Sequence, residues 1–105
     1  FLTNDFYNQA QMLAAEICEY LPKGEGWQYV RDGRIAFDGD RPVNSNGGRC
    51  HYGHAAGASG LHDLYEAVHQ MRGDAGATQA KHEVKRTLRG FGGAQNLLNI
   101  MLEKK

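Results

Sequence analysis

Residues 44–60 read NSNGGRCHYGHAAGASG, and this stretch is the most informative part of the 105-residue chain. Gly53, Gly57 and Gly60 surround small side chains, and apolar residues at helical spacing follow them, so the stretch predicts a glycine loop that opens onto a helix. Backbone N–H groups at a helix start are unpaired donors at the positive end of the helix dipole. Two interpretations are open: the loop holds a phosphate, a carbonyl oxygen or a developing oxyanion, or it is a tight turn for close packing. No G-K-[ST] follows the glycines, which excludes a Walker-type phosphate loop.

His54 is the side chain of this loop with the clearest chemical use. A histidine between glycines has little apolar surface to pack against, so its imidazole can approach a substrate as a general base. The alternative is a solvent-exposed loop histidine. Cys50 is a weaker candidate for a nucleophile, because neighbours on an extended segment point in opposite directions and His51 would face away from it. We expect Cys50 to be a small buried side chain.

A metal site is the other chemistry to consider, because Cys50, His51, His54 and His62 are close in the sequence. Structural zinc normally uses two ligand pairs at short, regular spacing, and no second pair follows these residues. We therefore expect no metal in this chain.

The segment before the glycine loop begins with a predicted helix. Apolar residues at spacings of three and four indicate a helix within residues 1–21, capped by Asn4 or Asp5 and ended by Pro22. The members of its apolar stripe are Ala10, Leu13, Ala14, Ile17 and Leu21.

The remaining chain is expected to alternate between turns, one more helix and two strands. Residues 22–49 are rich in turns and include a predicted hairpin at 29–35 around an Asp-Gly pair. Within 50–73, the glycine and histidine loop leads into a helix that ends at Gly73. Residues 80–105 contain two strand-like runs on either side of a glycine turn at 90–93. The expected apolar face of the second helix consists of Leu61, Leu64, Val68 and Met71.

Composition narrows the class of protein. Twelve Lys and Arg balance twelve Asp and Glu, which argues against a surface for nucleic acid. No apolar run approaches the roughly 18 residues that a membrane-spanning helix needs. Two cysteines cannot build a disulfide framework, so we expect a reducing, cytoplasmic location. The chain begins with Phe1 instead of Met, and we expect it to be a processed product or a piece of something longer.

Four motifs in the same order resemble the C-terminal end of a thiolase, with the sterol-carrier-type branch as the closest likeness. Residues 44–48 and 53–60 are similar to the N-x-x-GG and GHPxGATG segments of that family. Residues 4–7, NDFY, look like its NEAF or HDCF motif, and residues 90–94, GFGGA, match its closing glycine turn. The resemblance covers nearly the whole chain. It implies an α/β fold, a mixed sheet packed by helices, that is incomplete without the rest of a thiolase.

The resemblance also implies roles for named residues. His54 takes the place of the histidine that accepts the proton of the nucleophilic cysteine, and Asn4 that of the asparagine that helps to form one oxyanion hole. Gly90 corresponds to the glycine whose backbone N–H serves the other hole. Preorganised donors of this kind are typically worth a few kcal/mol each. The loop residues implied to face the oxyanion or the substrate are Gly53, Gly57, Ala58 and Ser59.

The sequence departs from the family pattern at several places. The nucleophilic cysteine of thiolases lies in the N-terminal half, outside these 105 residues. The second cysteine, which is acid and base in the Claisen step, aligns with Leu88, and leucine cannot transfer a proton. Ala55 replaces the proline after the histidine. Thiolase-like aldolases that lack the second cysteine use a tyrosine, and Tyr52 is a candidate for that role or else a loop aromatic that packs on the hairpin.

The implied function is the C-terminal part of a thiolase-type acyltransferase of lipid metabolism that makes or cleaves a C–C bond next to an acyl-CoA thioester. The alternatives are a thiolase-fold aldolase that uses Tyr52, and a non-catalytic piece for acyl-CoA binding or assembly. Coenzyme A enters as the substrate thioester, and we expect no other cofactor. The implied partners are the rest of the thiolase polypeptide or a complementary subunit, further copies in a homo- or hetero-oligomer, and a zinc-ribbon/OB-fold accessory protein.

Overall fold

The computed structural model describes residues 1–4, 8–55, 57–93 and 96–105, and it describes the backbone alone for residues 4, 8, 86–93 and 96–99. The helices are α1 (Asn8–Ile17), α2 (Gly26–Arg31), α3 (Gly48–Tyr52) and α4 (Ser59–Arg72), and a short 3-10 helix, η1 (Gly76–Thr78), follows α4. No helix in the described part of the chain has the length and apolar character to cross a membrane.

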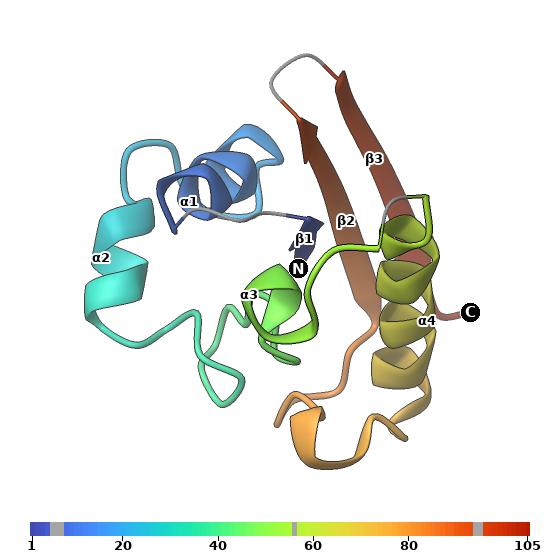
Figure 1. The fold of residues 1–105 in the computed structure, drawn as a ribbon. Coiled ribbons are helices and arrows are strands. Elements are labelled where there is room, and N and C mark those ends of the chain that lie inside the picture. The colour runs from blue at the N-terminus through green and yellow to red at the C-terminus, as the bar shows by residue number, and fades with distance from the viewer. Residues whose placement is uncertain (5–7, 56, 94–95) are drawn as a thin grey trace.

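A three-stranded mixed sheet lies at the centre of the fold, in the order β1-β2-β3 (Figure 1). β1 (Leu2–Asn4) runs parallel to β2 (Arg86–Gly93), and β2 runs antiparallel to β3 (Asn96–Glu103). The first segment of the chain therefore lies beside β2, and the described helices lie between these two strands in the sequence.

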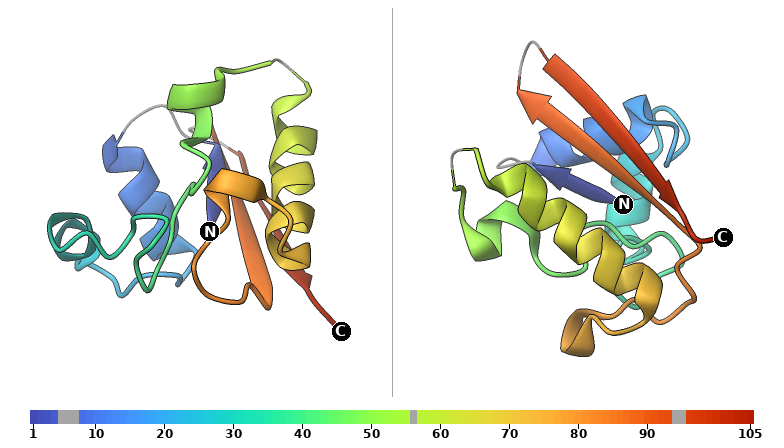
Figure 2. Two further views of the ribbon diagram at one scale, coloured as in Figure 1. Left: turned by 90° about the horizontal axis from the view of Figure 1, so that it is seen from below. Right: turned by 90° about the vertical axis from the view of Figure 1, so that its right-hand side faces the viewer.

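Helices cover both faces of β1. In both views of Figure 2, α1 and α4 flank the strands, and each of these helices contacts β1 and β2. Leu2 and Thr3 are both buried, and neighbouring strand residues point to opposite faces of a sheet. The core beside α1 is small, with Ala15, Leu21 and Tyr29 buried and Phe1, Tyr20 and Ile35 packed against them.

The first helix is shorter than the sequence predicts. The chain starts with β1, and α1 ends at Ile17, shortly before the chain turns at Glu19 with a φ of 57°. Asn4 belongs to β1 and is not a helix cap, and Asp5 lies outside the described residues. Periodicity located the helix but missed this short strand, because three residues are too few to show alternation.

The buried face of α1 also differs from the predicted stripe. Leu13 and Ile17 are each 56% exposed, whereas Ala14 and Ala15 are buried. Alanines let a helix approach its neighbours closely, so Ala14 and Ala15 face the core, whereas Leu13 and Ile17 face outward.

The hairpin predicted at 29–35 is not formed. Residues 26–31 form α2, which buries Tyr29, and the Asp-Gly pair ends this helix. The N–H of Asp32 donates to the carbonyl of Gln28 at 2.9 Å, and Gly33 has a φ of +69°. A left-handed glycine suits a helix end as well as a hairpin turn, so the Asp-Gly pair alone does not distinguish the two structures.

Glu16 fastens the start of α2 to α1. Its carboxylate accepts the backbone N–H groups of Gly24 and Gly26, both at 2.8 Å. These two bonds, that from Gly24 first, lower the pKa of Glu16 below its ordinary value of 4.5.

We expect Glu16→Gln to destabilise the full-length protein at neutral pH and to have little effect in acid. Because the pKa of the folded state lies below that of the unfolded chain, the stabilisation by Glu16 is fully present above pH 4.5 and is lost as the pH falls through the folded-state value. Urea midpoints at several pH values measure the difference, with the exposed Glu19→Gln as the control. If the difference in urea midpoint between the wild type and Glu16→Gln did not change with pH, this expectation would be contradicted.

α4 ends as predicted, but its buried face is polar. Gly73 follows the helix with a φ of 82°, the left-handed conformation that ends helices. Leu61, expected on the buried face, is 69% exposed. The side chain of Gln70 donates to the carbonyl of Thr78 at 2.7 Å and accepts the N–H of Ala80 at 2.9 Å, so hydrogen bonds to the following segment determine the buried side. The buried residues of α4 are Ser59, Asp63, Glu66, Ala67 and Gln70.

The two closing strands are present, but the expected turn at 90–93 is not where the chain reverses. β2 continues to Gly93, which pairs with Asn96 of β3, and the connection at 94–95 lies outside the described residues. Glycines inside a strand often mark close approach of another backbone or a ligand.

Candidate active site

A short helix stands where the sequence predicted the first part of the glycine loop. α3 begins after Gly47, with a φ of 87°, and ends before Gly53, with a φ of 73°. A Cβ at Gly47 would lie 2.7 Å from the Cβ of His51, so this position requires glycine. Cys50 is exposed, contrary to the expected burial, because α3 turns Arg49 inward in its place.

Asn44 attaches this helix to the sheet. Its side-chain oxygen accepts the N–H of Thr3 at 2.8 Å, and its amide donates to the carbonyl of Thr3 at 3.1 Å. The side chain thus imitates a neighbouring strand on the edge of β1 that β2 does not use. The asparagine of the 44–48 motif therefore covers a strand edge and places α3 beside β1.

A buried ion pair between Arg49 and Asp63 joins α3 to α4. Their side chains are 3% and 6% exposed. The Arg49 guanidinium also donates to the carbonyl of Ser59 at 3.0 Å and more weakly to that of Gly53 at 3.4 Å. Sequence reasoning missed both residues, because no periodicity or motif relates an arginine on one element to an aspartate on another.

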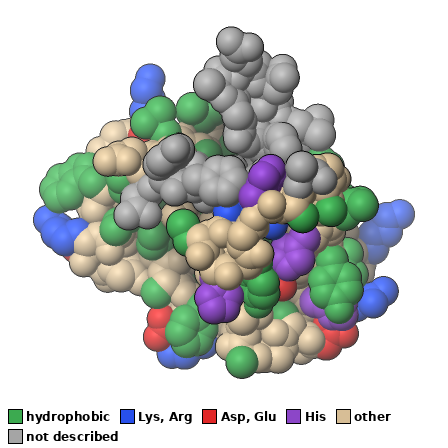
Figure 3. Space-filling view, in the orientation of Figure 1, with side chains coloured by type: hydrophobic (Ala, Val, Ile, Leu, Met, Phe, Trp, Pro, Cys, Tyr) green, Lys and Arg blue, Asp and Glu red, His purple; other side chains and the backbone are tan. Residues whose placement is uncertain are grey.

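His54 lies between α3 and α4, and its ring contacts the first residue of α4. Its Nδ1 is 2.8 Å from the Oγ of Ser59, the buried first residue of α4. Figure 3 shows histidine side chains gathered over α3 and α4 on this face. The other residues expected in this loop lie beside His54 in one segment, and they are Gly53, Gly57 and Ala58.

The strand register brings Asn4 and Gly90 together from the two ends of the sequence. Thr3 lies opposite Gly90 in the parallel pair, and Asn4 lies opposite Phe91. The carboxyl end of β1 and the amino end of α4 lie at the same end of the molecule in Figures 1 and 2. The predicted approach of the Asn4 side chain to His54 lies outside the described atoms.

Tyr52 is at the end of α3 and is 52% exposed. Its ring lies 5.0 Å from the rings of His51 and His62, measured between centroids. The packing of Tyr52 on a hairpin, expected as the structural alternative, does not occur, because residues 26–31 form a helix.

Comparison with known proteins identifies the family. Residues 2–102 match the family described as "Thiolase C-terminal domain-like". The chain belongs to this family. The resemblance to the C-terminal end of a thiolase is thereby confirmed.

Three curated relatives match most of this thiolase C-terminal domain, but the matched part is a small share of each relative. It is 40% identical over 78 residues to an acetyl-CoA acetyltransferase of Methanothermobacter thermautotrophicus, covering 74% of this chain and 20% of the relative. It is 39% identical over 69 residues to the benzoylsuccinyl-CoA thiolase subunit BbsB of Thauera aromatica, covering 66% and 18%. It is 34% identical over 94 residues to sterol carrier protein 2 of Rattus norvegicus, covering 87% and 17%. The chain thus spans at most a fifth of these curated relatives.

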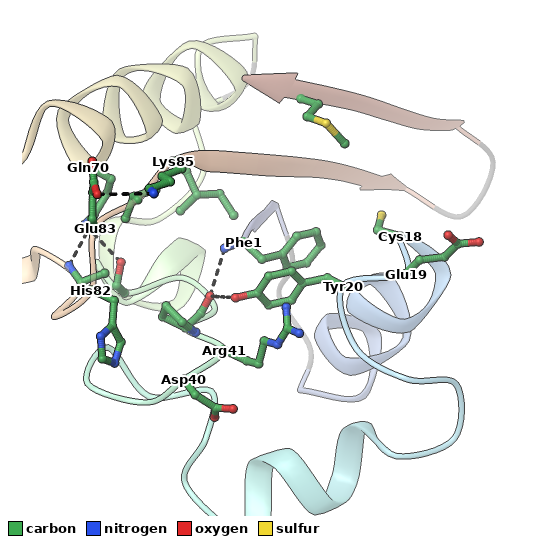
Figure 4. A pocket seen from close by; sticks show the side chains of 16 residues that line it. Phe1, Cys18, Glu19, Tyr20, Asp40, Arg41, Gln70, His82, Glu83 and Lys85 are labelled. Atoms are coloured by element: carbon green, nitrogen blue, oxygen red, sulfur yellow. Dashed lines mark hydrogen bonds and ion pairs between the residues drawn. The ribbon is translucent and has the colours of Figure 1, made fainter. Parts of the chain in front are cut away.

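Two cavities in the described part of the thiolase C-terminal domain lie away from His54. One of about 450 Å³ has Phe1, Tyr20 and Arg41 in its wall (Figure 4), and one of about 700 Å³ lies along Leu13 and Ile17. Burial, opposed by the charge of Arg41, raises the pKa of Tyr20 to about 12, so this hydroxyl keeps its proton near neutral pH. Neither of these two cavities includes His54 or Tyr52.

Among the residues whose placement is described, no group of three or more His, Cys, Asp or Glu side chains is arranged to hold a metal ion.

Proposed function

We propose that this thiolase C-terminal domain belongs to an acyltransferase that makes or cleaves a carbon–carbon bond next to the thioester carbonyl of an acyl-CoA. The observation that carries the proposal is the placement of His54, whose ring is fixed by Ser59 at the start of α4. This is the end of the fold to which β1 brings Asn4. The names of the relatives, an acetyl-CoA acetyltransferase and a thiolase subunit, agree with this chemistry.

In the proposed reaction, His54 accepts the proton of a cysteine thiol supplied by the remainder of the protein. The resulting thiolate attacks the thioester carbonyl carbon, the bond to the departing sulfur breaks, and the proton on His54 returns to that sulfur. Asn4 is proposed to stabilise the charge that develops on the carbonyl oxygen.

Gly90 is proposed as the second oxyanion donor, with one structural condition. It lies in β2, the central strand, with Thr3 on one side and Asn99 on the other. Backbone N–H groups of a central strand point toward a neighbouring strand. The N–H of Gly90 can therefore serve an oxyanion only where it is not used in the ladder.

The rest of the thiolase polypeptide, or a complementary subunit, is the proposed cover of this site. His54 is exposed, and on α4, the helix that follows its loop, Leu61 and Tyr65 are 69% and 63% exposed. An apolar surface next to an open catalytic loop is what a missing half of an active site would bury.

A retro-aldol reaction is the second candidate, favoured by Leu88 and Tyr52. Leucine at the place of the second cysteine removes the acid–base group of the Claisen step, and Tyr52 presents its ring on the exposed side of α3. In this reaction the tyrosine, through its hydroxyl, would transfer the proton that the cysteine transfers in thiolases.

The full-length protein, assayed on acyl-CoA substrates with and without free CoA, distinguishes these functions. We expect cleavage that requires free CoA and that Tyr52→Phe leaves nearly unchanged, as does the control Tyr65→Phe on α4. Cleavage that is indifferent to CoA and lost only in Tyr52→Phe would establish the aldolase instead. Absence of activity on every acyl-CoA would contradict both enzymes and favour a role in binding or assembly.

A further inference from the structure

The segment 42–44 lies along the edge of β1 that faces away from β2. The Phe1 nitrogen donates to the carbonyl of Pro42 at 3.0 Å, and the N–H of Asn44 donates to the carbonyl of Phe1 at 2.8 Å. These two bonds follow the pattern of a parallel strand pair. The backbone leaves this path at Asn44, which has a left-handed φ of 47° and whose carbonyl accepts the N–H of Gly47 at 2.7 Å. The backbone of the segment therefore pairs with Phe1 and then turns towards α3.

The side chain of Asn44 continues the pairing by one further step. Its Oδ1 accepts the N–H of Thr3 at 2.8 Å, and its Nδ2 donates to the Thr3 carbonyl at 3.1 Å. A backbone N–H can only donate and a carbonyl can only accept, so these two contacts determine the orientation of the amide. A Cβ at Gly48 would lie 2.8 Å from Nδ2 of Asn44, so the glycine leaves the room that the amide needs.

The contact with Thr3 also fixes the peptide group from which Asn4 begins. The Thr3 carbonyl and the Asn4 nitrogen belong to one planar peptide group. Backbone groups of neighbouring strand residues point to opposite edges, so those of Asn4 face β2, where Asn4 lies opposite Phe91. The Thr3–Asn4 peptide group is thus held by Asn44 from one edge and by β2 from the other. Thr3 is 2% exposed, so little water can replace these bonds.

We propose that Asn44 is a positioning residue that holds the backbone of Asn4 where Asn4 serves the oxyanion. The consequence for catalysis rests on the proposed function, whereas the fixing of the peptide group rests on the contacts alone. An oxyanion donor must keep its place closely, because a misplacement of about 1 Å can lower a rate on the order of 10²-fold. The Asn44 carbonyl also closes the turn that leads to α3 and on to His54, so one residue relates the two parts of the proposed site.

Two variants of Asn44 remove the contact in different ways. Asn44→Gly deletes the amide and adopts a φ of 47° without strain, so it introduces no backbone cost of its own. Asn44→Asp keeps the size of the side chain and the acceptor for the Thr3 N–H, but it places an oxygen against the Thr3 carbonyl. The control is Ser45→Ala, which removes a hydroxyl of the same loop that accepts from Gln70 of α4 at 3.2 Å.

Amide hydrogen exchange of the full-length protein tests the fixing of the peptide group. We expect the Thr3 N–H to exchange about tenfold faster in Asn44→Gly than in the wild type or in Ser45→Ala. The N–H of Ala80, which donates to Gln70 at 2.9 Å, is the internal reference and should keep its rate. Unchanged exchange of Thr3 in Asn44→Gly, or an equal acceleration of Ala80, would overturn the proposal.

A double-mutant cycle with Asn4 separates positioning from general stability. We expect Asn44→Gly and Asn44→Asp to lower kcat on the order of tenfold with KM little changed, and Ser45→Ala to keep nearly full activity. In an Asn4→Ala background, Asn44→Gly should lower kcat no further, because no Asn4 amide is left to misplace. Wild-type kcat in both Asn44 variants, or the same loss in both backgrounds, would overturn the proposal. The exchange experiment gives its answer even if the wild type has no acyl-CoA activity, so failure of the proposed function remains distinguishable.

Discussion

His54→Ala in the full-length protein is expected to lower kcat by about 10²–10⁴-fold, the usual effect of losing a general acid–base group. The reason is that the alanine variant has no imidazole to take the thiol proton at the position that Ser59 and the start of α4 determine. Binding of acyl-CoA should change little, because the proposed role of His54 lies in proton transfer. Steady-state kinetics with a saturating acyl-CoA measure the loss.

His51→Ala is the matched control for this prediction. His51 is also exposed and close in sequence, but it lies on α3, where its ring packs against Tyr52 at 5.0 Å. We expect this variant to keep nearly full activity. Equal losses in both variants would show that the effect arises from the surface around α3 and not from the His54 imidazole.

The largest effect on stability is expected from breaking the ion pair between Arg49 and Asp63. Asp63→Ala leaves a buried guanidinium without its carboxylate, which typically costs about 3–5 kcal/mol of the free energy of unfolding. The loss should also reduce activity, because Arg49 holds the carbonyl of Ser59 at 3.0 Å. Urea unfolding of the full-length protein measures the first effect, and kcat the second.

Two further variants make this prediction specific. Asp38→Ala removes the partner of Lys81 from an exposed pair and should cost less than about 1 kcal/mol. The double variant Arg49→Met with Asp63→Leu removes both buried charges and should recover most of the stability lost in Asp63→Ala. If Asp63→Ala were no more destabilising than Asp38→Ala, the pair would not be the link between α3 and α4 that the structure indicates.

Local signals in the sequence predicted some elements correctly and misled for others. The extent of α4 and its end at Gly73 followed from helical spacing and one glycine. Its buried face did not, because Gln70 is buried by hydrogen bonds to Thr78 and Ala80, and such partners are not visible in a hydrophobic pattern. The hairpin at 29–35 failed for a related reason, since its Asp-Gly pair serves equally as a helix end.

Some residues of the candidate site could also be predicted from the sequence, and others could not. His54, Gly57 and Ser59 lie within one short stretch, so the sequence already placed them in one loop. The neighbourhood of Asn4 and Gly90 depends on the pairing of β1 with β2, which are far apart in the sequence, and here only the resemblance to thiolases suggested that they act together. The ion pair between Arg49 and Asp63 was not predicted. These residues lie on different helices, and no local pattern in the sequence indicates that folding brings them together.

The release of CoA in the first turnover tests the role of His54 most directly, because it reports the acyl transfer to the cysteine before any later step. With enzyme in excess over acyl-CoA, wild-type protein is expected to release CoA rapidly, and His54→Ala to release it about 10²–10⁴-fold more slowly. Release of CoA by His54→Ala at the wild-type rate would contradict the assignment of His54 as the proton acceptor.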